Sequence, residues 1–203
     1  MRDSSAGIDR GLVLLGSAIP LVFIATNIVC GFVLGDYNHL TRLVSELGAL
    51  GTRSQHLFTA GLLLCSALSL LFVVGLCRSC VAAGLSVVPA LVILAYTESI
   101  AGAALFPLPL RLHLVLGMPS ILLVLSPALA LLLWRRLPHM VLMAAISLAV
   151  MSLGFLTYLP DVLGDYPGLK QRFFHLGWAV WFLCLSYRFA HLPDSRAPEP
   201  RPT

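Results

Sequence analysis

The sequence predicts an all-α membrane protein, a six-transmembrane-helix bundle with a short amphipathic helix in its first outer loop. Two observations predict this fold class. Of the 203 residues, 59% are hydrophobic and only 11% are charged, whereas soluble domains average roughly 45–50% apolar and 25% charged residues. The apolar residues also fall into six runs, each close to the length of about 20 residues that a helix needs to cross a bilayer. The mean hydropathy of +0.93 agrees with both.

The six runs are separated by polar connections. The predicted spans cover residues 11–35, 57–77, 81–106, 112–134, 140–160 and 173–191. The first span contains Pro20, which a membrane helix tolerates. Arg78 and Ser79 leave room for only a tight turn between the second and third spans. We expect residues 11–192 to form one membrane domain between a flexible N-terminus, 1–10, and a disordered C-terminal tail, 193–203, that is rich in proline and charge.

Residues 36–56 form the longest polar interruption. They include two His, two Arg, an Asp and a Glu. Apolar residues recur within the segment at helical spacing, namely at Leu40, Leu43, Val44, Leu47 and Leu50. This pattern predicts a short amphipathic helix that ends at Gly48 and Gly51. We expect it to lie at the membrane interface or to dip into the bundle.

The distribution of basic residues predicts the orientation. Six spans put both termini on one side, and eight Lys and Arg residues fall on that side against five on the other. The positive-inside rule therefore favours cytoplasmic termini in the cytoplasmic membrane. The formal net charge of +4 is modest, and we expect membrane lipids as partners and not nucleic acid.

Polar residues gather on the predicted outer face, which holds five of the nine carboxylates and four of the six histidines. Glu98 lies within the third span, about two turns below its outer end. A charge at such a depth is costly unless it faces a cavity or a partner. We therefore predict an outward-facing polar pocket. Its predicted walls are Glu46, Arg53, His56, Glu98, Arg111, His113, Arg172 and His175.

These residue types suggest separate roles. The candidate catalytic acids and bases are Glu46, Glu98, His113 and His175. The candidate ligand-binding residues are Arg42, Arg53, His56, Arg111, Arg172 and Trp178. The arginines would hold the phosphate or carboxylate head of an amphiphilic small molecule, whose tail lies between helices. A structural alternative stays open, in which Glu98 only pairs with a nearby arginine and the histidines are interfacial or solvated.

A metal site is the sharpest form of the catalytic hypothesis. Two or three histidines with a carboxylate can bind zinc, with water as a further ligand. The chain has no H-E-x-x-H motif, so such ligands would have to converge from separate helices. Ser45 or Ser99 would serve a serine mechanism, although no nucleophile elbow is present. Zinc is therefore suggested by residue type alone.

Residues 37–51, YNHLTRLVSELGALG, resemble the Y-x7-S-E-L-G-A-x-G segment of the DUF998 family of small, mostly bacterial, multi-pass membrane proteins. The resemblance continues through Phe106-Pro107, His113 and residues 171–178, and it covers roughly residues 10–190. It implies a six-helix membrane fold and no particular activity. Where the family pattern has an acidic residue after Phe-Pro, this chain has Leu108 and Pro109. In coarse shape the family is also similar to alkaline-ceramidase-type membrane hydrolases.

Two functions remain open. The first is a lipid-binding, transport or accessory protein, in which carboxylates and arginines pair for structure. The alternative is a membrane-embedded hydrolase or transferase that acts on a lipid, with His and Glu binding metal or acting as acid and base. We favour the first, because the sequence contains no specific catalytic signature.

Overall fold

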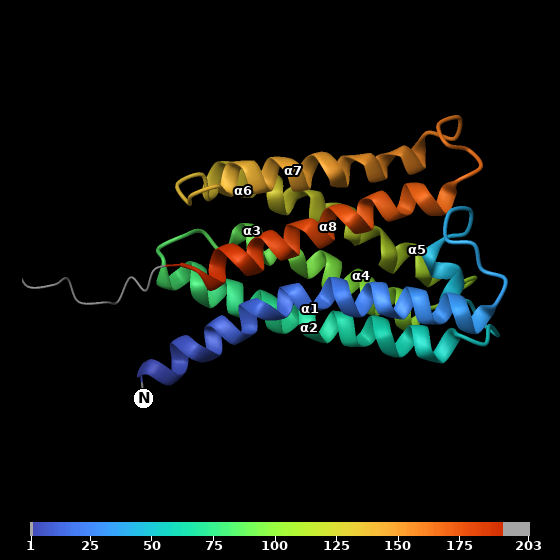
Figure 1. The fold of residues 1–203 in the computed structure, drawn as a ribbon, viewed down its shortest axis with the longest axis horizontal. Coiled ribbons are helices and arrows are strands. Elements are labelled where there is room, and N and C mark those ends of the chain that lie inside the picture. Colours follow the sequence, from blue (N-terminus) through green and yellow to red (C-terminus); the bar gives the residue numbers. More distant parts are fainter. Residues whose placement is uncertain (1, 193–203) are drawn as a thin grey trace, which may run out of the picture.

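The computed structural model describes residues 2–192, so the predicted C-terminal tail lies outside the described residues. This part of the chain consists of helices and loops that form an elongated bundle (Figure 1). The first helix begins and the last helix ends at the same end of the bundle. We call the opposite end, which carries the connections 35–54, 106–110 and 159–166, the loop end.

Each predicted run is helical. The first two are α1 (Arg2–Leu34) and α2 (Gln55–Ala82), and α1 thus begins within the predicted flexible N-terminus. The third comprises α3 (Val88–Leu91) and α4 (Ile93–Leu105). The fourth comprises α5 (Arg111–Gly117), the 3-10 helix η2 (Met118–Val124) and α6 (Leu125–Leu133). The fifth comprises α7 (Met140–Ser152) and the 3-10 helix η3 (Leu153–Tyr158), and the sixth is α8 (Pro167–Ala190).

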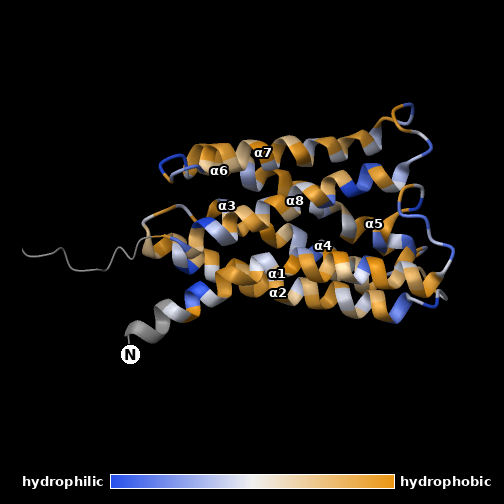
Figure 2. Ribbon diagram, viewed as in Figure 1, coloured by the Kyte–Doolittle hydropathy of each residue, from blue (hydrophilic) through white to orange (hydrophobic). Residues whose placement is uncertain are grey.

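Among the described residues, five helical segments are long and apolar enough to cross a membrane. They are Gly7–Leu34, Gln55–Ala82, Val88–Leu105, Arg111–Leu133 and Met140–Tyr158. Figure 2 shows the apolar residues along the helices and many of the polar ones at the two ends of the bundle. The chain is therefore a multi-pass membrane protein.

The sixth predicted span, α8, is not among these five segments. Lys170, Arg172 and Arg188 near its ends lower its hydropathy. In Figure 1, α8 lies between α1 and α7, and Trp178 and Trp181 in its middle are fully buried. A helix that is covered by other helices needs less apolar surface than one that faces lipid. The prediction of six spans is thus corrected to six helical runs with five candidate spans.

The tight turn predicted at Arg78 and Ser79 is wrong, because α2 continues to Ala82. Arg78 stays within the helix, and its Nε lies 2.7 Å from Asp9 Oδ1 on α1. Gly84 ends the helix with a φ of +65°, a conformation that glycine adopts without strain. The turn between the second and third helical runs is therefore placed at Gly84 and not at Arg78.

The loop between α1 and α2, which was predicted to be the first outer loop, contains one short 3-10 helix, η1 (Val44–Gly48), in place of the predicted amphipathic α-helix. Val44 and Leu47 are buried in the bundle, whereas Leu40 and Leu50 are each 48% exposed. Only part of the apolar stripe is therefore buried, and the buried residues of η1 pack against α1 and α2.

Aromatic rings in the middle of the bundle fix the position of α8. The ring of Trp178 lies 4.8 Å from that of Tyr96 on α4 and 5.3 Å from that of Phe182. The Ser186 hydroxyl donates to Val13 O on α1 at 2.7 Å. These contacts hold α8 against α1 and α4, and they set the height and rotation of the residues that precede Trp178 at the loop end.

Candidate functional site

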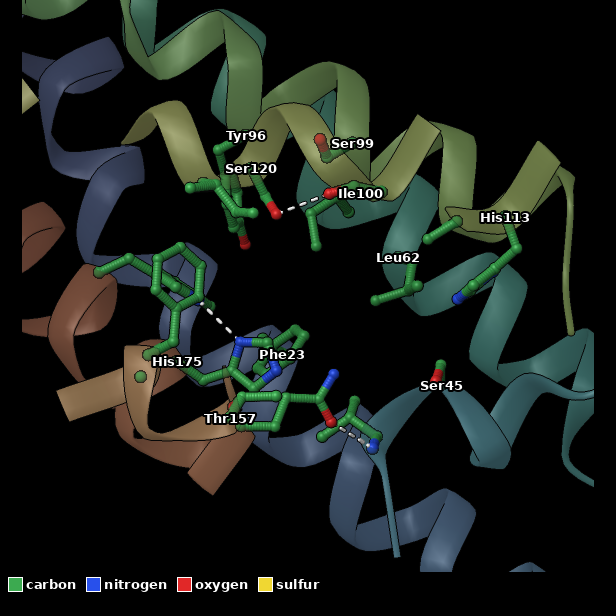
Figure 3. Close-up of a pocket in the computed structure, with 18 of the residues that line it drawn as sticks. Phe23, Ser45, Leu62, Tyr96, Ser99, Ile100, His113, Ser120, Thr157 and His175 are labelled. Atoms are coloured by element: carbon green, nitrogen blue, oxygen red, sulfur yellow. Dashed lines mark hydrogen bonds between the residues drawn. The ribbon is translucent and has the colours of Figure 1, made fainter. Parts of the chain in front are cut away.

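A cavity of about 220 Å³ lies in the loop-end half of the bundle, between α1, α2, α4, α5, η2, η3 and α8 (Figure 3). Its polar lining residues are Ser45, Tyr96, Ser99, His113, Ser120, Thr157, Tyr158, Gln171 and His175. The remaining lining residues are apolar or glycine, including Phe23, Phe58, Leu62, Phe174 and Trp178. Asp, Glu, Lys and Arg are absent from this set. The cavity therefore suits a molecule that is partly apolar and partly polar but uncharged.

His175 forms one side of the cavity (Figure 3). The Trp178 indole N–H donates to His175 Nδ1 at 3.1 Å. Because an indole N–H can only donate, Nδ1 is the acceptor, and a neutral ring carries its proton on Nε2. The Phe23 ring packs on the imidazole with the two centroids 4.8 Å apart. His175 therefore holds an N–H donor in a fixed direction.

His113 lies across the cavity from His175 (Figure 3). Its Nδ1 is 2.9 Å from the carbonyl oxygen of Phe106. A carbonyl oxygen only accepts, so Nδ1–H is the donor and Nε2 of the neutral ring keeps a free lone pair. The cavity thus offers a hydrogen-bond donor on one side and an acceptor on the other.

Three buried polar atoms of lining residues have no hydrogen-bond partner within the described part of the chain. They are Tyr96 Oη, Ser99 Oγ and His175 Nε2. Leaving a buried donor or acceptor unpaired costs roughly 1–3 kcal/mol. A polar group bound in the cavity would remove this cost. These atoms therefore point to a ligand head that can both donate and accept hydrogen bonds.

Arg172 connects the loop between α1 and α2 to the start of α8 through hydrogen bonds. Its Nη1 donates to Arg42 O at 3.2 Å and to Gly168 O at 2.9 Å. Its Nη2 is 3.0 Å from both Tyr37 Oη and His39 Nδ1, which accept. A Cβ at Gly168 would overlap Arg42 O, so the loop and α8 are in backbone contact. We call Tyr37, His39, Arg42 and Arg172 the loop clamp.

The electrostatics of the loop clamp follow from partial burial. Burial lowers the pKa of His39, and the Arg172 guanidinium lowers it further. Burial also raises the pKa of Tyr37, against the opposing effect of its hydrogen bond with Arg172. Within the clamp, a neutral histidine and a neutral tyrosine therefore surround the guanidinium of Arg172.

Glu46 belongs to this loop and not to the cavity. Its Oε2 lies 2.8 Å from Arg42 Nε, and its Oε1 accepts the Leu43 N–H at 2.8 Å. The hydrogen bond with Glu46 raises the pKa of Arg42. Asp36 adds a longer contact of 3.7 Å to Arg42. The neighbouring Ser45 does line the cavity (Figure 3), so one turn of η1 supplies both a structural carboxylate and a cavity hydroxyl.

The structure brings together only part of the predicted pocket. Of its eight predicted wall residues, His113 and His175 line the cavity, and the candidate ligand residue Trp178 joins them. Glu46, Arg42 and Arg172 form the loop structure described above. The other predicted residues are exposed and do not line this cavity: Arg53, His56, Glu98 and Arg111. The arginines predicted to hold a charged head are thus not in it.

Tyr96 and Gln171 were not singled out as site residues from the sequence, nor were Ser120 and Thr157. Tyr96 and Ser99 are three residues apart, a spacing that puts them on one helix face, and that spacing could have identified them. Ser120 lies in η2 and Thr157 in η3. Their direction depends on 3-10 geometry, which the apolar pattern of those spans does not reveal.

The candidate zinc ligands do not converge. Within the described chain, no group of three or more His, Cys, Asp or Glu residues is placed to hold a metal ion. His113 and His175 share the cavity, but Glu46 is bound to Arg42 and Glu98 lies on the outer surface of α4. The residues of this cavity therefore do not fit a zinc centre.

A second cavity of about 260 Å³ lies between α1 and α8. Its lining includes Asn27, His39 and Arg172, and it shares Phe23, Val44, His175 and Trp178 with the first cavity. Asn27 Nδ2 donates to Phe23 O at 2.6 Å, and its buried Oδ1 has no partner among the described residues. The shared side chains form a wall between the two spaces.

Comparison with known proteins gives one match. The sequence profile of a family described as "Protein of unknown function (DUF998)" matches residues 17–188. No curated protein and no solved structure matches the chain. The match covers all the helical runs that build the cavity.

Proposed function

Because the chain belongs to the DUF998 family of proteins and is a multi-pass membrane protein, we propose that it binds a membrane lipid in the loop-end cavity. The bound molecule has an uncharged polar head and an apolar tail. The protein serves as a lipid-binding, transport or accessory component of the membrane. With the termini cytoplasmic, the cavity faces outward in the cytoplasmic membrane.

The unpaired atoms Tyr96 Oη, Ser99 Oγ and His175 Nε2 carry this proposal. They belong to three residues of one cavity, and their burial is costly without a partner. A hydroxyl group or an ester or amide carbonyl of a lipid head would pair with them. Aromatic rings such as Phe23 and Phe174 supply the apolar surface that such a molecule needs next to its head.

The absence of charged lining residues favours an uncharged head. Arg172, the predicted phosphate ligand, already donates through Nη1 and Nη2 to four acceptors of the protein. A phosphate placed in the cavity would lose its hydration without gaining a cation. Lipids with hydroxyl, ester or amide heads, such as diacylglycerols or ceramides, meet the requirement by their chemistry.

The test is native mass spectrometry of the protein released from its own membranes, combined with thermal unfolding. We expect a bound lipid on the wild type and a lower occupancy on Tyr96→Phe and Ser99→Ala. The control is Ser147→Ala, which removes a buried hydroxyl that already donates to Met143 O at 2.8 Å.

The sign of the stability change in Tyr96→Phe is decisive. If no ligand uses Tyr96 Oη, removing an unpaired buried hydroxyl should raise the unfolding temperature. If a lipid pairs with it, the lipid-bound protein should unfold at a lower temperature than the wild type, since part of the binding free energy is lost. No bound lipid together with a stabilised variant would refute the proposal.

A hydrolase or transferase is the second candidate, favoured by the orientation of His113. In the neutral ring, the hydrogen bond from Nδ1–H to Phe106 O leaves Nε2 as the nitrogen with a free lone pair, which is the arrangement a general base needs. Ser45 supplies a hydroxyl to the same cavity. Incubation with ester- and amide-linked lipids should then give product that His113→Gln abolishes while lipid binding persists. Binding without turnover in the wild type would leave only the first function.

A further inference from the structure

The fourth and fifth helical runs both change from α-helix to 3-10 helix beside the cavity. The fourth passes from α5 into η2 and returns to an α-helix at α6, and the fifth passes from α7 into η3. Residues from both 3-10 segments line the cavity, including Ser120 and Ile121 from η2 and Phe155 and Thr157 from η3. A 3-10 stretch within a longer helix often marks a site of movement or strain. Here two such stretches border the same space.

The two 3-10 segments pack on different partners. η2 packs against α4, η3 packs against α8, and α6 packs against α7 further along the same two runs. η2 and η3 are not among the closely packed pairs of elements. α7 also contacts η2, so the fourth and fifth runs are joined from the end that holds the termini as far as η2 and separate beyond it, toward the loop end.

Exposure shows that the cavity opens between these segments. Phe155 and Tyr158 line the cavity and are nevertheless 39% and 60% exposed. Thr157, between them, is also exposed and lines the cavity. On the other side of the opening, Ser120 and Ile121 of η2 line the cavity and are half-buried. The side chains of Phe155 and Ile121 put apolar surface on both sides of this opening, which suits a hydrocarbon environment.

We propose that the cavity's ligand is a bilayer lipid that enters sideways between η2 and η3 and leaves its hydrocarbon tail in this opening. This inference rests on the proposed lipid-binding function and adds the route and the tail position. The head reaches Tyr96, Ser99 and His175, while the tail lies along Ile121, Phe155 and Tyr158 in contact with the surrounding acyl chains. A freely soluble polar ligand would gain little from an opening with these rims.

The second cavity offers a competing route between α1 and α8. Its outer side is formed by Ile24, Ile28 and Leu176, which are exposed. A lipid that arrived there would meet the wall of Phe23, His175 and Trp178. That wall is held by the Trp178–His175 hydrogen bond and by the Phe23–His175 ring contact. At the opening between η2 and η3, by contrast, the exposed residues Phe155 and Thr157 line the first cavity directly.

The first experiment uses the full chain in phosphatidylcholine nanodiscs that contain a diacylglycerol with a diazirine near the end of one acyl chain. After irradiation, the modified residues are mapped by mass spectrometry. We expect adducts concentrated at Ile121, Phe155 and Tyr158. Adducts concentrated at Ile24, Ile28 and Leu176, or spread evenly over the lipid-facing helices, would overturn the inference.

The second experiment narrows the opening. Ile121→Trp should slow the exchange of bound diacylglycerol several-fold, whereas Leu132→Trp on the 70% exposed surface of α6 should not. Equal exchange rates in the two variants would contradict lateral access at this place. A lipid that is bound in native mass spectra but labelled elsewhere would refute the route and leave the binding function intact. No bound lipid in either experiment would refute both.

Discussion

The indole N–H of Trp178 donates to Nδ1 of His175, 3.1 Å away and one helical turn earlier in α8. This bond fixes the tautomer of the imidazole and turns Nε2–H into the donor that the cavity offers. Both residues also contact Phe23 on α1, with ring centroids 4.8 Å and 5.2 Å apart. The direction of the donor is thus set by two helices, which ties ligand binding to the packing of α8.

Trp178→Phe should reduce lipid occupancy, since it removes the bond that orients His175 while it keeps an aromatic ring in the core. Trp181→Phe is the matched control, because it removes a comparable buried bond, from Nε1 to Ser126 Oγ at 2.9 Å, outside the cavity. Each change should lower stability by about 1–3 kcal/mol through an unpaired partner. Native mass spectra should show lipid loss in the first variant only. Similar occupancy in both would contradict the role of the His175 tautomer.

Arg172→Lys should destabilise the loop between α1 and α2. A lysine keeps the charge but cannot donate to Arg42 O, Gly168 O, Tyr37 and His39 together. Because hydrogen bonds from a charged group contribute about 1.5–3 kcal/mol each, the loss should amount to about 2 kcal/mol or more. Thermal unfolding should show it, with increased hydrogen exchange at residues 37–44. The same substitution at the exposed Arg53 should change neither, and an equal effect at Arg53 would refute the clamp.

The loop clamp should weaken in acid. The pKa of His39 is lowered in the folded protein by burial and by Arg172, and Nδ1 must stay unprotonated to accept from Arg172. The unfolded chain titrates near the usual value of about 6.5. The contribution of neutral His39 is therefore complete above that pH and is lost as the pH falls through the lowered pKa of the folded state.

Unfolding temperatures measured between pH 8 and pH 5 will test whether the stabilisation by neutral His39 is lost in acid. His39→Gln should flatten the decline on the acid side, whereas His56→Gln, at an exposed position, should leave the wild-type profile unchanged. If the profile is the same in all three proteins, His39 does not govern it.

Glu98→Gln should leave lipid occupancy unchanged, because Glu98 is exposed on α4 and does not line the cavity. Removing a charge that faces hydrocarbon should also maintain or raise the unfolding temperature. Occupancy and melting curves of the purified variant check both points. A loss of bound lipid, at unchanged stability, would show that Glu98 takes part in binding after all.

Glu98 and Ser99 show how far sequence reasoning reached. Span length and hydropathy correctly predicted six helical runs, and the sequence also placed Glu98 within the third of them. The sequence did not reveal which face of this helix points to the cavity, because α4 has apolar residues on most sides. Leu94, one turn before Glu98, is also 37% exposed. Ser99 therefore faces the cavity and Glu98 does not.

The loop residues illustrate a second limit. Glu46 and Arg42 were recognised as polar residues of one segment, yet their spacing of four residues equally suits a local ion pair, and they form one. Arg172 joins them from a position 130 residues away. Such a long-range contact leaves no periodic signal in the sequence. Only the structure therefore shows that the charged residues belong to the loop clamp and that the cavity is lined by uncharged ones.

The most direct test of an uncharged head is the thermal stabilisation of delipidated protein by two ligands with the same acyl chain, a monoacylglycerol and its phosphate. Binding to the folded state raises the unfolding temperature, and at equal ligand concentration the ligand with the higher affinity raises it more. We predict that the monoacylglycerol raises it in the wild type, raises it less in Tyr96→Phe, and acts more strongly than the phosphate. Stronger stabilisation by the phosphate, or none by either ligand, would contradict a cavity built for an uncharged lipid head.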